Sequence, residues 1–123
     1  MIVSLIVAPL KKQQFQAPFA PFINCINLTH LTIGTSSDRY RVEIYPDSFK
    51  NCQRIKSITV PKTIKMYEDS FNYCISLKDI YFLGTMAEWN ALDFVKSNVQ
   101  WVSGINGYTV HCSDGVIKKQ LNN

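Results

Sequence analysis

The chain has few histidines and only a small excess of positive charge. It contains two histidines, at positions 30 and 111, and 13 basic against 9 acidic residues, for a formal net charge of +4. This excess is too small to indicate a nucleic-acid-binding protein, since the basic pairs Lys11-Lys12 and Lys118-Lys119 lie near the two ends. The four cysteines form no Cys-x-x-Cys pair. We therefore expect no metal or cofactor site.

Long hydrophobic runs are also missing. The longest, from Ile2 to Leu10, is interrupted by Ser4 and Pro9, whereas a membrane-spanning helix needs about 20 apolar residues. A signal peptide would require a Lys or Arg before the apolar run, and none precedes it here. We expect a chain without a membrane span that is cytoplasmic, already processed or part of something longer.

Hydrophobic residues are nevertheless abundant, at 46% of the 123 residues. This fraction exceeds that of a disordered chain. At this length the composition predicts one domain, residues 1–123, around one core.

Internal repetition occupies the middle of the chain. Residues 42–60 align without a gap with residues 64–82, and residues 22–33 align with residues 49–60. Five additional residues fall between the first two units, within the segment 34–41. The shared unit reads Phe-x-x-Cys-x-x-Leu-x-x-Ile-x-Val, a pattern that chance does not produce three times in so short a stretch.

The repeat length and its apolar spacing predict the fold class. Units of 22 to 27 residues are typical of solenoids, and apolar steps of three, three and two are typical of leucine-rich repeats. The closing Ile-x-Val pair alternates like a short strand with both side chains pointing inward. We expect a β-rich α/β fold, a right-handed leucine-rich-repeat solenoid of about three repeats over residues 22–82. Residues 1–21 are interpreted as a degenerate N-terminal repeat.

The segment 83–117 is predicted to cover the end of the solenoid. Thr85 and Glu88 have the spacing of a capping box at the start of a short amphipathic helix, expected from about Met86 to Val95. Ser113-Asp114-Gly115 separates two apolar segments and predicts a β-hairpin. Residues 118–123 are expected to be a tail. The two tryptophans, at positions 89 and 101, are expected to pack in the core or the cap.

Cys25, Cys52 and Cys74 occupy one position of successive repeats. They are expected to stack at about 5 Å per repeat as a column of inert, buried thiols. His111 and Cys112 are neighbours on a predicted strand, so their side chains point to opposite faces. This geometry is wrong for a nucleophile and its base.

His30, Ser57 and Asp79 also fall in one column, which places a serine, a histidine and an aspartate in register. A catalytic triad requires the histidine between the other two, whereas here Ser57 is in the middle. His30 and Asp79 are expected about 10 Å apart from the strand spacing. We therefore predict no catalytic residue in this chain.

Two surfaces are candidates for partner binding. The first consists of the outward residues of the predicted strands, namely His30, Thr32, Ser57, Thr59, Asp79 and Tyr81. The second is the insertion, where Arg39, Tyr40 and Arg41 combine an aromatic ring with two guanidinium groups. The alternative for the second is a solvated connection between repeats.

The unit Phe-x-x-Cys-x-x-Leu-x-x-Ile-x-Val-Pro, clearest in residues 49–61, resembles the BspA-type leucine-rich repeat. Residues 81–89 resemble the Gly-Thr-x-x-x-Trp segment that follows the last repeat of this family, and residues 108–115 resemble its closing segment. The resemblance covers roughly residues 22–117. It implies a bacterial, sometimes protist, surface family that serves in adhesion and protein–protein contacts.

The expected function is therefore that of a non-catalytic interaction or adhesion module of a cell-surface or secreted protein. The resemblance implies a protein partner, such as a host or matrix surface protein. The alternative is a structural spacer or terminal cap of a longer solenoid, with no ligand of its own. Since no capping pattern precedes the first repeat, its open edge is expected to allow homodimer formation.

Overall fold

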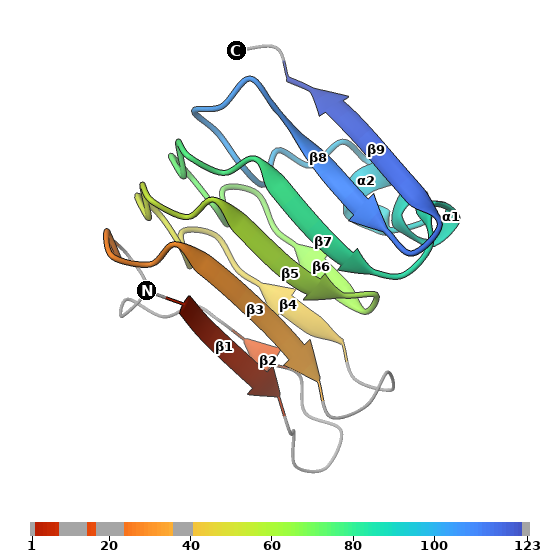
Figure 1. Ribbon diagram of the computed structural model, residues 1–123, viewed down its shortest axis with the longest axis horizontal. Coiled ribbons are helices and arrows are strands. Elements are labelled where there is room, and N and C mark those ends of the chain that lie inside the picture. Colours follow the sequence, from red (N-terminus) through yellow and green to blue (C-terminus); the bar gives the residue numbers. More distant parts are fainter. Residues whose placement is uncertain (1, 8–14, 17–23, 36–40, 122–123) are drawn as a thin grey trace.

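The chain folds into two β-sheets with two short helices beside them (Figure 1), and their strands are parallel except for the last strand of the longer sheet. The computed structural model describes residues 2–7, 15–16, 24–35 and 41–121. One sheet has six strands in the order β1-β3-β5-β7-β8-β9, and the other has three in the order β2-β4-β6. The bounds are β1 Ile2–Val7, β2 Phe15–Gln16, β3 His30–Thr35, β4 Val42–Ile44, β5 Ser57–Pro61, β6 Ile64–Met66, β7 Asp79–Leu83, β8 Gly107–Cys112 and β9 Gly115–Gln120.

From β1 to β7 the chain alternates between the two sheets. Each strand lies beside, and parallel to, the strand that comes two earlier in the sequence. The inward side chains of both sheets belong to one hydrophobic core. The β-rich α/β class expected from the sequence is therefore confirmed.

The sequence repeats coincide with the register of the long sheet. Leu31 of β3 pairs with Ile58 of β5, which pairs with Ile80 of β7. All three side chains are at most 1% exposed. Val60 and Phe82, two residues further along their strands, are paired and buried in the same way. The apolar residues that alternate with polar ones along each strand therefore form rows of buried contacts between neighbouring strands.

An Asp-Ser-Phe turn precedes each of the last two repeat cores. Asp47 and Asp69 both adopt positive φ values near 60°, a conformation that aspartate tolerates better than most residues. The hydroxyls of Ser48 and Ser70 then donate to the carbonyl three residues earlier. The following phenylalanines stack with their centroids 4.9 Å apart and an interplanar angle of 7°.

The cysteines form the expected column, although it is not buried throughout. Cys52 and Cys74 are fully buried, whereas Cys25 is only partly buried. All four cysteines are thiols rather than disulfides. Burial is the main cause that raises the pKa of Cys52 to about 11 and that of Cys74 to about 12. The Cys74 thiol also donates to the carbonyl of Phe49 at 3.1 Å.

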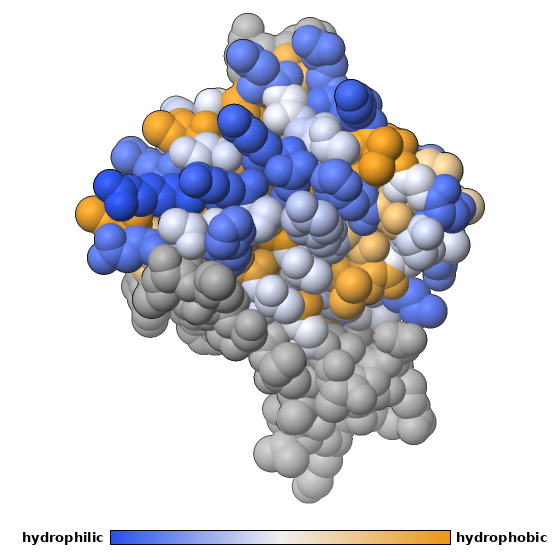
Figure 2. All heavy atoms as spheres, in the orientation of Figure 1, coloured by the Kyte–Doolittle hydropathy of each residue, from blue (hydrophilic) through white to orange (hydrophobic). Residues whose placement is uncertain are grey.

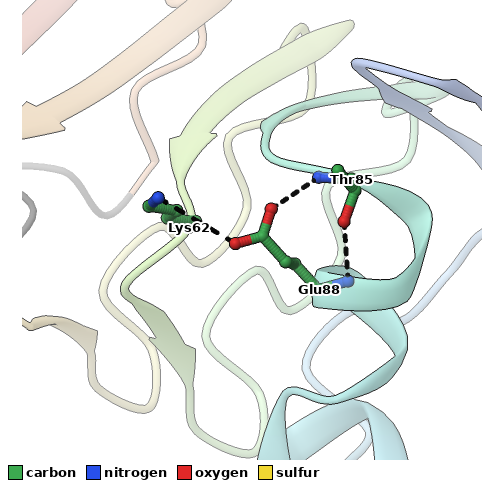
Figure 3. A network of polar contacts seen from close by, with 3 residues as sticks. All are labelled: Lys62, Thr85 and Glu88. Atoms are coloured by element: carbon green, nitrogen blue, oxygen red, sulfur yellow. Dashed lines mark hydrogen bonds and ion pairs between the residues drawn. The ribbon is translucent and has the colours of Figure 1, made fainter.

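The predicted capping box is present at the start of α1, Met86–Asn90 (Figure 3). The Thr85 hydroxyl accepts from the Glu88 amide at 3.1 Å, and the Glu88 carboxylate accepts from the Thr85 amide at 2.9 Å. The hydrogen bond from the Thr85 backbone is the main cause that lowers the pKa of Glu88. Lys62, at 3.9 Å, adds an exposed ion pair from the connection between β5 and β6.

The prediction of one helix from Met86 to Val95 is wrong, because the segment forms two helices. After α1, Leu92 is extended, with φ −65° and ψ 138°, and α2 then covers Asp93–Lys96. Trp89 and Phe94 are both buried and meet edge to face at 5.6 Å. In a continuous helix they would point about 140° apart, at 3.6 residues per turn. The break therefore allows both rings to enter the core.

The hairpin that follows extends the long sheet. β8 lies parallel to β7, and β9 returns antiparallel to β8 after the turn at Ser113-Asp114. β9 continues to Gln120, so residues 118–120, expected in a tail, are paired with β8. Trp101 is buried as predicted and meets Phe71 edge to face at 5.7 Å.

We expect Thr85→Ala to lower the free energy of unfolding by about 1 kcal/mol, because it leaves a helical amide without its acceptor. Thermal or urea unfolding followed by circular dichroism measures this loss. Thr85→Ser keeps the hydroxyl and should retain most of the stability. An alanine variant as stable as the parent would contradict a stabilising role for this cap.

We expect Cys52 and Cys74 to react with iodoacetamide far more slowly than Cys112 in the native protein at pH 8. Their burial blocks access, and their raised pKa values leave little thiolate at that pH. Mass spectrometry after timed quenching counts the labelled thiols, and all four should react in urea. Fast native labelling of Cys74 would contradict the buried column.

Candidate functional site

The six outward residues predicted on the strands lie on one face of the six-stranded sheet. We call this set the outer strand face; its members are His30, Thr32, Ser57, Thr59, Asp79 and Tyr81. The register places one row, His30, Ser57 and Asp79, side by side and a second row, Thr32, Thr59 and Tyr81, beside it. All six side chains are partly or fully exposed, because the residues between them on each strand fill the core.

Strand β8 extends both rows. Thr109 pairs with Asp79, and His111 pairs with Tyr81. The Tyr81 and His111 rings stack with their centroids 4.6 Å apart and an interplanar angle of 16°. Nε2 of His111 lies 2.8 Å from the Asp79 carboxylate, so one histidine holds both neighbours. The stacked imidazole thus supports one face of the tyrosine ring.

Thr109 and His111 were missed as members of this face. Their signal was available, because Thr109-Val110-His111 repeats the polar-apolar-polar pattern of Ser57-Ile58-Thr59. The sequence interpretation assigned β8 to a cap, which hid its parallel pairing with β7. Val110 is fully buried, whereas His111 is partly exposed and Cys112 packs against the core.

The serine, histidine and aspartate of the first row do not form a triad. Nδ1 of His30 lies 2.7 Å from the Ser57 hydroxyl, but the Asp79 carboxylate is bonded to His111. A triad needs a carboxylate that orients the histidine bonded to the serine. The geometry instead offers exposed hydrogen-bonding groups and a stacked aromatic ring.

The outer strand face is polar with small apolar areas. In the space-filling view of Figure 2, blue and white spheres cover most of its middle. Tyr81 is 43% exposed, and Leu83 at the end of the same strand is 60% exposed. Neutral hydroxyls, one histidine–aspartate hydrogen bond and one tyrosine ring suit a partner that supplies hydrogen bonds and a flat apolar contact.

The second candidate surface lies largely outside the described residues. Arg39 and Tyr40 fall in the undescribed segment 36–40, and Arg41 is exposed directly before β4. The positive charge of Arg41 acts on Tyr67, which follows β6 in the short sheet. Arg41 therefore lies beside the short sheet and does not contribute to the outer strand face.

The short sheet carries a buried carboxylate that sequence analysis did not single out. Glu43 is 5% exposed and accepts hydrogen bonds from the Tyr45 and Tyr67 hydroxyls, at 3.2 and 3.0 Å. Loss of solvent is the first cause that raises the pKa of both tyrosines, and Glu43 adds to it. The tyrosine rings pack with centroids 4.8 Å apart. This cluster satisfies a buried charge with two phenols.

An open hollow of about 460 Å³ lies between β6 and α2. Its lining comes from the short sheet, α2 and the segment after it, so it is separate from the outer strand face. The lining includes Lys65, Tyr67, Glu68, Phe94, Asn98 and Gln100. Among the described residues, no group of three or more His, Cys, Asp or Glu side chains is placed to hold a metal ion. None of the described helices has the length and apolar character needed to cross a membrane.

Comparison with known proteins identifies the class of the chain. A family model described as "BspA type Leucine rich repeat region (6 copies)" matches residues 17–108. The chain belongs to this family, as the resemblance in its sequence indicated. No curated protein and no solved structure matches it. Proteins of this family are generally interaction or surface repeat modules.

Proposed function

We propose that this chain is a non-catalytic protein-binding module of a surface or secreted protein, with an adhesive role toward a host or matrix protein. Its architecture is that of a short leucine-rich-repeat solenoid closed by the helices and the hairpin. Family membership and the alternation of strands between two parallel sheets support this interpretation. Repeat proteins commonly bind partners through such extended faces.

The observation that carries the proposal is the in-register outer strand face. Four neighbouring strands, β3, β5, β7 and β8, present exposed side chains at matched positions. Tyr81 is held by His111, which in turn is held by Asp79. An aromatic side chain that is already packed against a neighbour loses less conformational entropy in a complex than a free one and is a favourable anchor.

We expect the double variant His30→Ala/Tyr81→Ala to lose a protein that the parent chain captures from extracellular-matrix or host-cell extracts. Removal of one anchor typically costs more than 1 kcal/mol of binding free energy, or about fivefold or more in Kd. Immobilised chains and quantitative mass spectrometry identify the protein, and titration of that protein gives the affinities. Circular dichroism verifies that the variant is folded.

The matched control is Lys65→Ala/Glu68→Ala, at the hollow beside the short sheet, which should bind like the parent. Arg39→Ala/Tyr40→Ala/Arg41→Ala tests the insertion separately. Equal capture by the parent and the His30/Tyr81 variant would contradict the outer strand face as the site. If none of the chains captured a protein, the result would favour the alternative, a spacer or cap without a ligand.

We also propose that the chain forms homodimers through β1. In the described part of the chain β1 is an edge strand with one neighbour, β3, and an unpaired edge offers backbone donors and acceptors to another strand. Light scattering should show a mass that rises toward that of a dimer with concentration, and Ser4→Lys should suppress this rise by adding charge to the edge. A monomer at all concentrations would contradict this proposal.

A further inference from the structure

A second exposed surface follows the turns that precede the strands of the long sheet. We call it the turn ridge; it comprises residues 24–29, 50–56, 72–78 and 103–106. Backbone hydrogen bonds join these segments side by side, including Asn24 to Lys50, Asn51 to Asn72 and Lys78 to Lys56. The Ser103 hydroxyl accepts from the Tyr73 amide at 3.2 Å and so attaches the last segment to the third.

The conformation of Tyr73 distinguishes it on this ridge. It has φ 60°, and every other non-glycine residue with positive φ in the described part of the chain is an asparagine or an aspartate. The corresponding positions of the two preceding repeats are Asn24 and Asn51, with φ 61° and 60°. A tyrosine is strained there, because only short polar side chains adopt this conformation readily. Such strain commonly marks a functional position.

The ring of Tyr73 is displayed rather than buried. Tyr73 is 52% exposed and Ile75 is 54% exposed. A Cβ added at Gly104 would lie 3.4 Å from Cδ1 of Tyr73 and 3.2 Å from Cγ2 of Ile75. Both side chains therefore lie beside Gly104, which has no side chain. Ile26, at the first segment of the ridge, is 56% exposed.

The charge of the ridge has one sign. Its four segments carry Lys50, Arg54, Lys56 and Lys78 and none of the nine acidic residues of the chain. The lysine–carboxylate ion pairs of the described residues lie elsewhere, at Glu88 and Asp93. Figure 2 shows deep blue and orange spheres side by side at the left edge, where Figure 1 places the turns before β3 and β5.

We propose that the turn ridge binds an acidic protein segment that also carries apolar side chains. Tyr73 and Ile75 would contact its apolar residues, while Arg54, Lys56 and Lys78 would pair with its carboxylates. Charge complementarity selects the acidic partner, and the displayed aromatic and aliphatic side chains favour a peptide over an anionic polysaccharide, which offers carboxylates or sulfates without apolar side chains. This surface adjoins the outer strand face, because Lys56 and Lys78 directly precede Ser57 and Asp79, but the two share no residue. The proposal therefore does not rest on the function proposed above.

A phage library of random dodecapeptides tests the chemistry of the partner. It is selected on the parent chain and counter-selected on the triple variant Lys56→Glu/Tyr73→Asn/Lys78→Glu. The proposal expects enriched peptides with a net negative charge and at least one aromatic or large aliphatic residue. Enrichment of neutral or basic peptides, or no enrichment beyond the counter-selection, would overturn it.

The single variant Tyr73→Asn then tests the role of the ring. Asparagine is the residue of the two preceding repeats and is relaxed at this φ, so the variant should melt at the same temperature as the parent or above it. Calorimetric titration with the most enriched peptide should show about fivefold or more weaker binding. Unchanged affinity in the folded variant would overturn the assignment of Tyr73 as the anchor.

Two control variants separate the ridge from general charge and apolar effects. Lys118→Glu/Lys119→Glu makes the same change in charge on β9, and Val116→Asn removes another exposed apolar side chain. Both should bind the peptide like the parent. Peptide-induced shifts in the amide NMR spectrum should fall in residues 54–56, 72–78 and 103–106. Displacement by heparin together with indifference to Tyr73→Asn would indicate a polysaccharide site and contradict the proposal.

Discussion

The parallel register between successive strands is the constraint on which the rest of this structure depends. Pairing of Leu31 with Ile58 and of Ile58 with Ile80 buries three aliphatic side chains completely or nearly so. A slip by one residue would turn this buried set outward and expose it to water. The penalty would be repeated at each strand, so the register is specified several times over.

The same register creates both proposed binding surfaces. Because the inward residues are fixed, the residues between them must project outward in rows, which gives the outer strand face. Because the turns before the strands are hydrogen-bonded to one another, their exposed side chains also lie in columns. Stability therefore depends on the inward residues of each strand and recognition on the outward residues between them. A substitution of an outward residue leaves the buried contacts between strands intact.

The features that repeat along the chain could be predicted from the sequence. The features that depend on tertiary contacts could not. The inward positions, the capping box, the hairpin and the buried tryptophans follow from local spacing, and the structure confirms them. The break at Leu92 was missed because it depends on Trp89 meeting Phe94 in the core. The polar-apolar-polar pattern of residues 109–111 was a signal for an outward His111, but its place beside Tyr81 also depends on the parallel pairing of β7 and β8. Whether the outer strand face binds a partner stays a prediction.

The connection between β3 and β4 bears on how such a protein diversifies. The chain has five residues more between Ile33 and Val42 than between the aligned Val60 and Ile64, yet β3 and β5, and likewise β4 and β6, remain in register. The entropic penalty of a longer loop grows only slowly with its length. Additional segments can therefore be inserted at this connection without a change in the strand register. Evolution or protein engineering can use it to add new binding residues.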